Sequence, residues 1–273
     1  MDIKNKAFAF LQDILKSANP SRNGLQKITL SDALKMKKQD VKNIENWQLR
    51  ALLALEIGKL FDDHGEYEDA YELTSIAVAL YTKNMPWTNE AGEACNIMGL
   101  IHLHQNKNEE ALKFFNHAII HYTRNNENSF IVSRIYRNIA VAYVNMRKLD
   151  DAMLYSKKSL DLCIKLKNEL DIARAYNNLG LIYYKRENEG DNEKCLDCHK
   201  KALELKLNNL SNDNDIELAS CYYSLALAYL RFNEYEQASQ NAEKAYNIAI
   251  TMYDESHPFC KQYKNILEKT LRH

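Results

Sequence analysis

Apolar residues recur along most of this chain at the three- and four-residue spacing of a single helix face, and short polar segments separate the helical runs. A small residue that follows an apolar one returns at nearly constant intervals of 41, 41, 40 and 46 residues: Gly58, Gly99, Ala140, Gly180 and Ala226. A second set keeps almost the same period, with intervals of 41, 41, 43 and 43: Ala70, Ala111, Ala152, Cys195 and Ala238. Two independent sets with one period predict five repeats of a helical hairpin.

Close packing of helices explains why these positions are small. The first set should lie where the first helix of each hairpin crosses the second, and the second set where that second helix meets the next hairpin. An aromatic residue three positions after the first small residue should fill the space between hairpins, at Phe61, Tyr143, Tyr183 and Tyr229. The pattern therefore predicts an all-α array.

These positions are the ones by which the tetratricopeptide family is recognised, and the resemblance covers about residues 51–250. The usual period of that family is about 34 residues, so a period of about 41 resembles its long-helix members. Such members occur in kinesin light chains and in bacterial peptide-pheromone sensors. The resemblance implies a right-handed α-solenoid of five hairpins.

The predicted organisation has three parts. Residues 1–50 form a helical N-terminal cap, residues 51–255 hold the repeats, and residues 256–273 form a capping helix with Pro258 in its first turn. The repeats are expected at 51–91, 92–132, 133–172, 173–218 and 219–255. Residues 187–193 should lengthen the loop of the fourth hairpin.

The resemblance also implies that the first helix of each repeat lines an inner groove. The groove positions, counted from the small residue, include an apolar strip of Leu100, Val141, Leu181 and Leu227 and a polar row of Asn96, Arg137, Asn177 and Tyr223. The other candidates are Arg134, Asn145, Arg174, Tyr184, Lys185 and Arg231.

The chemistry of these candidates suits a peptide. An amide side chain both donates and accepts, so an asparagine can hold a peptide bond from two sides. A guanidinium can clamp a carboxylate with two hydrogen bonds. We therefore expect an extended protein segment or short peptide that carries an acidic group or a free C-terminus. The alternative is that these are ordinary polar residues of a wet groove.

Composition agrees with a helical, globular chain. Hydrophobic residues make up 46% and charged residues 27% of the 273 residues, and 7 Gly and 3 Pro are too few for a chain rich in tight strand turns. The net charge of −1 disfavours polyanion binding by the chain as a whole, although residues 1–50 alone carry +5.

That basic segment permits a second interpretation. Residues 30–46 resemble helices two and three of a phage-repressor-type helix-turn-helix, with Lys35 at the glycine position of the turn. In that alternative Lys37, Lys38, Gln39 and Lys42 would face DNA. The chain would then resemble peptide-pheromone-responsive regulators, which join such a domain to long tetratricopeptide repeats. A helical cap for the array is the competing explanation.

Other local signals do not point to chemistry. Cys195, Cys198 and His199 match the haem-attachment pattern of c-type cytochromes, but they fall within a repeat helix, where burial is expected. His117 and His121 are one helical turn apart, yet no third metal ligand is indicated. No phosphate loop, nucleophile elbow or carboxylate pair is present, so we expect neither an enzyme nor a cofactor.

The location follows from the same kind of reasoning. All six cysteines lie in apolar helical pattern, no export signal is visible, and no apolar run is long enough to cross a membrane. We expect a cytoplasmic, peptide-binding scaffold or adaptor. A peptide-sensing regulator is the alternative, and the oligomeric state, a homodimer included, stays open.

Overall fold

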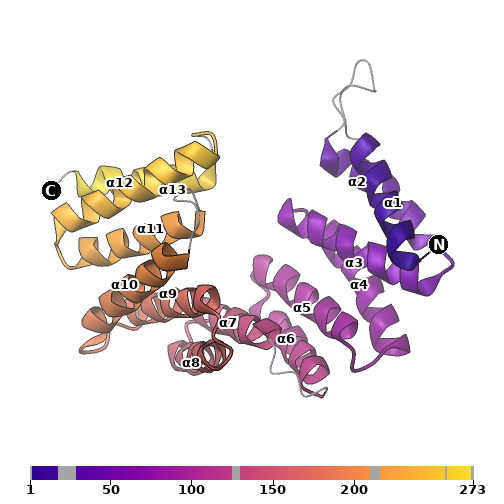
Figure 1. The fold of residues 1–273 in the computed structure, drawn as a ribbon, viewed down its shortest axis with the longest axis horizontal. Coiled ribbons are helices and arrows are strands. Elements are labelled where there is room, and N and C mark those ends of the chain that lie inside the picture. The colour runs from indigo at the N-terminus through magenta and orange to yellow at the C-terminus, as the bar shows by residue number, and fades with distance from the viewer. Residues whose placement is uncertain (1, 18–28, 125–129, 210–215, 256, 272–273) are drawn as a thin grey trace. The chain divides into compact units, whose positions relative to one another are not determined.

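A computed structural model describes residues 2–17, 29–124, 130–209, 216–255 and 257–271 of the chain. Within these ranges, all thirteen regular elements are α-helices. They divide between two compact units, Met1–Asn128 and Ser129–His273, each of which is a stack of helices (Figure 1).

The first unit contains two hairpins preceded by two further helices. Its helices are α1 (Ile3–Ser17), α2 (Leu30–Lys42), α3 (Trp47–Asp63), α4 (Tyr67–Asn84), α5 (Asn89–His104) and α6 (Asn108–Thr123). Helices α3 and α4 form the first hairpin and α5 and α6 the second, while α1 and α2 pack against α3. The core of this unit includes Leu34, Leu53, Phe61 and Leu73, all fully buried.

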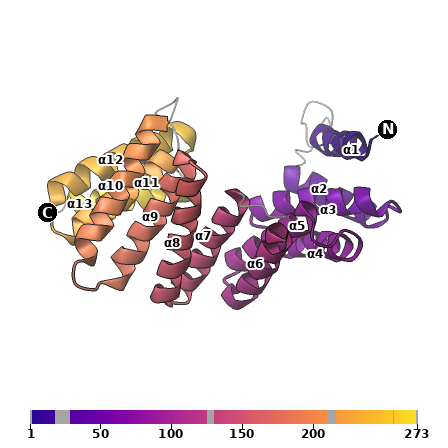
Figure 2. The same ribbon diagram turned by 60° about the horizontal axis from the view of Figure 1, so that its bottom comes forward.

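The second unit contains three hairpins and a final helix. Its helices are α7 (Phe130–Asn145), α8 (Leu149–Lys165), α9 (Glu169–Arg186), α10 (Asp191–Asn209), α11 (Ile216–Arg231), α12 (Tyr235–Met252) and α13 (Pro258–Thr270). The hairpins are α7–α8, α9–α10 and α11–α12, and α13 packs against both α11 and α12 (Figure 2). This arrangement confirms the predicted five hairpins and terminal helix.

Side-chain caps fix where several helices begin. Thr29 accepts a hydrogen bond from the backbone N–H of Asp32, whose carboxylate in turn accepts one from the Thr29 backbone, which makes a capping box for α2. Asn46 caps α3 and Asn168 caps α9 in the same polar manner. His257 caps α13, with Pro258 at its first position as predicted.

The turns inside four of the hairpins share one backbone feature. A residue with left-handed backbone follows the first helix at homologous places, with φ of 75° at Gly65, 59° at Asn106, 58° at Arg147 and 60° at Asn233. The left-handed residue stops the helix and lets the next one begin two residues later. The fourth hairpin departs from this rule, because Glu187 takes the left-handed conformation and a longer loop precedes Asp191.

Glycine is required where the paired helices cross. A Cβ atom at Gly99 would lie 2.6 Å from the ring of Phe115, and one at Gly180 would lie 2.6 Å from the ring of His199. Both rings come from the second helix of the same hairpin. The expected crossing point is therefore confirmed at these repeats.

The proposed helix-turn-helix is not present as expected. That alternative to a helical cap requires a turn at Lys35, but α2 runs without a break from Leu30 to Lys42. The segment from 30 to 42 has no glycine or proline, and its alanine, leucine, methionine and lysine residues favour helix. The boundaries given above for the cap, the five repeats and the capping helix stay a prediction.

Candidate functional site

Two adjoining pockets lie in the second unit and share the side chain of Asn178. The first, called the basic pocket, has a volume of about 230 Å³ and is lined by Arg137, Ala173, Arg174, Asn177, Asn178, Lys206, Glu217, Ser220 and Cys221. The second, called the apolar pocket, has about 130 Å³ and is lined by Ala140, Val141, Val144, Asn145, Asn178, Leu181, Ile182 and Lys185.

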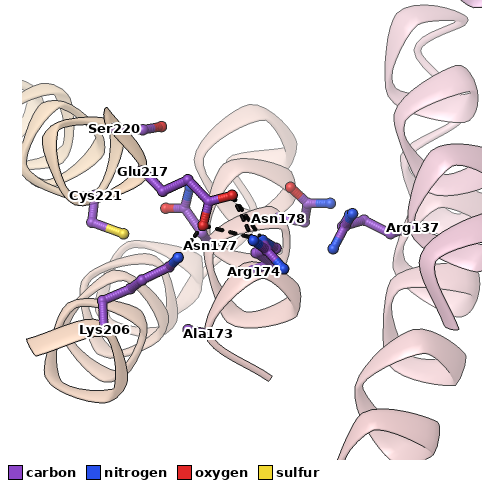
Figure 3. A pocket seen from close by; sticks show the side chains of 9 residues that line it. All are labelled: Arg137, Ala173, Arg174, Asn177, Asn178, Lys206, Glu217, Ser220 and Cys221. Atoms are coloured by element: carbon purple, nitrogen blue, oxygen red, sulfur yellow. Dashed lines mark hydrogen bonds and ion pairs between the residues drawn. The ribbon is translucent and has the colours of Figure 1, made fainter. Parts of the chain in front are cut away.

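Helix geometry explains how these side chains converge. Arg174, Asn177 and Asn178 lie three and four residues apart, so they share one face of α9. Arg137 reaches toward them from α7, and Glu217 reaches from the first turn of α11 to the guanidinium of Arg174 (Figure 3). The pocket therefore needs four helices of the unit to be in place.

A carboxylate lies at the centre of the basic pocket. Glu217 Oε1 accepts hydrogen bonds from Arg174 Nε at 3.0 Å and from Arg174 Nη2 at 2.7 Å, and Glu217 Oε2 pairs with the ammonium of Lys206. Partial burial opposes ionisation of Glu217, but the hydrogen bonds from Arg174 and Lys206 outweigh it and lower its pKa. Glu217 is therefore held as an anion.

A second, buried carboxylate gathers the guanidinium groups. Asp171, whose side chain is only 6% exposed, lies 2.8 Å from Arg174 Nη1, 3.6 Å from Arg137 Nη1 and 4.0 Å from Arg134 Nε. With Lys206 and Glu217 these side chains carry four positive and two negative charges, a net +2. The site therefore attracts anions.

Among the cations with mostly buried side chains, Arg137 has the fewest polar contacts. Its guanidinium makes no hydrogen bond to any residue that the structure describes, and its nearest carboxylate, Asp171, is shared. Burial lowers the pKa of Arg137, Asp171 acts against this, and the neighbouring charges of Arg174 and Arg134 lower it further. Its donors face the pocket and can receive an acceptor from outside the chain.

The side chain of Asn177 is oriented by a buried histidine that does not line the pocket. His199 Nδ1 lies 2.8 Å from Asn177 Oδ1, and burial lowers the pKa of this histidine to about 4, so its ring is neutral. A neutral ring that donates from Nδ1 leaves the Nδ2 donors of Asn177 available to the pocket. Most of the pocket's polar groups are therefore donors.

Seven of the sequence-predicted residues line the two pockets. Arg137, Arg174 and Asn177 line the basic pocket, and Val141, Asn145, Leu181 and Lys185 line the apolar pocket. Arg134 lies at the rim, ion-paired to Asp171 and more than half exposed. Asn96 and Leu100 belong to α5 in the first unit, where Asn96 Oδ1 is buried and has no partner among the described residues.

Four other predicted residues line neither pocket. Tyr223 packs against Tyr263 and accepts a hydrogen bond from Gln262, and Leu227 packs against the core cluster that contains Ile266, so both face α13. The guanidinium of Arg231 lies 3.5 Å from the ring centre of Tyr184, donates to the Tyr184 carbonyl and pairs with Glu187. The guanidinium of Arg231 is thus engaged by Tyr184 and Glu187, beside the α9–α10 loop.

Three pocket residues with a charge or an amide were not among the predicted site residues: Asn178, Lys206 and Glu217. Asn178 was passed over because only the position before it fitted the groove pattern, while Lys206 is on a second helix and Glu217 precedes the first groove position of its repeat. The adjacent asparagines at 177 and 178 were the one local signal for this part of the site.

The residues considered for DNA binding are engaged within the chain. Lys38 pairs with Asp69 and with Glu72 at 2.7 Å, Lys42 pairs with Glu72, and Lys37 lies 3.0 Å from Asp13. Gln39 donates to Asn43 on the same segment. These contacts compete with any phosphate for the lysines.

The residues that could suggest haem or metal are buried or hydrogen-bonded within the fold. Cys195, Cys198 and His199 are all buried, and burial raises the pKa of the two thiols to about 11 and about 12. His121 accepts a hydrogen bond from the backbone N–H of Trp87 at 3.1 Å. In the described part of the chain, no three His, Cys, Asp or Glu side chains are placed to hold a metal ion.

Comparison with known families agrees with the helical-hairpin fold. One tetratricopeptide-repeat model matches residues 171–251, which contain most of the basic pocket, and another matches residues 92–119. The chain contains tetratricopeptide repeats. Stacked tetratricopeptide repeats form scaffolds whose extended surfaces bind proteins. None of the curated proteins compared matches the sequence significantly.

Solved structures of other proteins share the fold. BtubC (BKLC) from P. vanneervenii is 20% identical with a TM-score of 0.65, over 83% of this chain and 91% of that one. A Rap protein complexed with competence and sporulation factor is 15% identical with a TM-score of 0.71, over 89% and 68%. A kinesin light chain with nearly identical repeats from Podosopora anserina is 14% identical with a TM-score of 0.59, over 77% and 100%.

Every helix in the described ranges is too short or too polar to cross a membrane.

Proposed function

We propose that this chain is a peptide-binding scaffold whose second unit holds an extended segment of another polypeptide. An acidic group of the segment enters the basic pocket, and a nearby apolar side chain enters the apolar pocket. The observation that carries this proposal is that the two pockets adjoin and share Asn178.

Asn178 is suited to hold the backbone between the two groups. Its side chain lines both pockets, is partly buried and makes no hydrogen bond to a described residue. An amide presents donors and an acceptor, so it can bond to both the N–H and the C=O of a passing peptide bond. Specificity would then come from the pockets on either side.

The apolar pocket supports the second contact. Val141 on α7 and Leu181 on α9 line it, and Leu181 remains 39% exposed although it lies next to buried core residues. Covering this surface with an apolar ligand side chain removes it from water, which is favourable by about 25 cal/mol per Å² of buried area.

A regulator that responds to a peptide is a second candidate. The Rap protein with the same fold was solved in complex with competence and sporulation factor. The lysines expected to face DNA pair with acidic residues of the chain itself, so a protein target fits this candidate better than DNA. A lack of binding to duplex DNA at low salt would agree with that choice.

The test uses synthetic fluorescent peptides in which an Asp and a Leu are separated by one to four residues. Matched peptides carry Asn for Asp, or Ser for Leu, and binding is followed by fluorescence anisotropy. We expect the Asp–Leu peptides to bind, and Arg137→Gln to weaken that binding about tenfold or more through loss of a charge-assisted hydrogen bond.

Arg231→Gln is the matched control for this variant. It removes the same charge from the same unit, but its guanidinium is engaged by Tyr184 and Glu187 outside both pockets. The proposal is wrong if the peptides bind equally well with Asn in place of Asp, or if the two arginine variants lose binding equally.

A further inference from the structure

The contacts of Glu217 define a seat for one carboxylate inside the basic pocket. Arg174 supplies two nitrogens, with Nη2 at 2.7 Å and Nε at 3.0 Å from Oε1, and Lys206 supplies an ammonium to Oε2. A guanidinium edge with a second cation beside it also suits the carboxylate of a ligand. Glu217 therefore occupies the position on Arg174 and Lys206 that a ligand carboxylate would take.

The cations of this seat cannot leave, but Glu217 can. Lys206 is only 2% exposed, and a buried ammonium without a counter-charge is strongly unfavourable. Arg174 is also anchored, because Asp171 holds its Nη1 at 2.8 Å. The side chain of Glu217, by contrast, is 39% exposed and can turn into water, where it regains full hydration.

An incoming anion would meet Glu217 directly. The site keeps a net charge of +2 with Glu217 in place, and Arg137 still has unused donors beside it. An acidic group drawn in by this charge brings two carboxylates close to the same Arg174 edge. Exchange keeps both Arg174 and Lys206 paired with a carboxylate.

We infer that Glu217 is a built-in occupant of the basic pocket, and that the ligand's acidic group is a carboxylate that replaces Glu217 on Arg174 and Lys206. This inference rests on the proposed function and names its ligand group. Glu217 also sets the threshold for binding, because any ligand must compete with a carboxylate that is tethered at the seat.

The first experiment tests the seat without any peptide. Glu217→Ala empties it, and the probes are acetate and inorganic phosphate, each compared with chloride at equal ionic strength by thermal unfolding. We expect acetate to raise the Tm of Glu217→Ala and to leave the wild-type Tm unchanged, because the wild-type seat is filled.

Glu169→Ala is the matched control. Glu169 is also an acidic residue in the first turn of a repeat helix, but its partner is the amide of Asn209 rather than a cation. An equal effect of acetate on both variants would overturn the inference. Stabilisation by phosphate but not by acetate would show that the seat takes a phosphate group and would overturn it as well.

The second experiment measures competition with Glu217→Gln, which keeps the size of the side chain and serves also if Glu217→Ala does not fold. Asp-containing peptides should bind this variant about tenfold more tightly than wild type, while their Asn versions and the Glu169→Gln control should not change. Equal or weaker binding of the Asp peptides would refute the exchange. If no peptide binds wild type or variant, the proposed function fails, and the acetate result still decides whether the seat accepts an external carboxylate.

Discussion

Substitution of Gly180 by alanine tests how the fold and the site are joined. Gly180 lies in the middle of α9, where it meets the imidazole of His199 from α10. A Cβ atom at this position would lie 2.6 Å from Cε1, 2.7 Å from Nε2 and 2.8 Å from Nδ1 of the ring. Three contacts shorter than 3.0 Å with one rigid ring cannot be relieved by rotating a flexible end group.

The expected magnitude follows from three opposing effects. Alanine is favoured over glycine in a helix by about 1 kcal/mol. Overpacking of a well-packed core typically costs about 1–3 kcal/mol, and His199 is only 2% exposed, so its ring has little room to shift. Displacing the ring also loses its hydrogen bond to Asn177, worth about 1 kcal/mol. We expect a net destabilisation of about 1–3 kcal/mol.

Urea unfolding of a double-mutant cycle isolates the clash. In a His199→Ala background the ring is gone, so Gly180→Ala should stabilise the protein by about 1 kcal/mol through helix propensity. The same variants should be assayed for peptide binding, because a displaced His199 no longer orients Asn177. If Gly180→Ala destabilises the protein equally in both backgrounds, the ring contact is not the cause and the reasoning is refuted.

Three further predictions concern buried groups. Burial lowers the pKa of His199 to about 4 from 6.5. The free energy of unfolding should therefore fall by about 3 kcal/mol as the pH drops from 6.5 to 4. Urea unfolding at a series of pH values should show a weaker dependence of this free energy on pH in His199→Asn. Asp171→Asn should destabilise the protein by about 2–3 kcal/mol in the same assay, since Arg174 and Arg137 then repel each other without a buried counter-charge, and an unchanged midpoint would contradict this. All six cysteines are buried, so a thiol reagent at pH 7.5 should label Cys195 and Cys198 only after unfolding; rapid labelling of the native chain would show that their helix opens.

The repeat architecture could be predicted because each small residue reports a local requirement of helix packing. Gly58, Gly99 and Gly180 are small because a side chain from the second helix of the same hairpin already occupies the adjacent space. This requirement recurs with every hairpin, so it leaves a period in the sequence that needs no knowledge of distant contacts.

The helix-turn-helix alternative was wrong at Lys35 because the apolar spacing it rested on does not distinguish two short helices from one long helix. Apolar spacing in a short segment is compatible with two short helices or with one continuous helix. Only packing against α3 and the ion pairs of Lys38 and Lys42 with acidic residues of α4 show which one forms. Spacing alone carries no information about those partners.

The two pockets were predictable only in part. The helical period put Arg137, Arg174 and Val141 on helix faces that line them, because position on a helix surface follows from sequence spacing. The helical period could not show that the guanidinium of Arg231 lies over the ring of Tyr184 and pairs with Glu187. Which residues contact Arg231 depends on which loop of the folded chain lies beside it.

Sequence by itself therefore determined the fold class and the five hairpins, since each depends on contacts repeated at a fixed interval. Tertiary structure alone decided which of the predicted residues line a pocket. Lys206, Arg174 and Glu217 come from three different helices, and only the packing of those helices places Glu217 against both cations. Charge pairing between helices follows no sequence period, so it becomes visible only when the chain is folded.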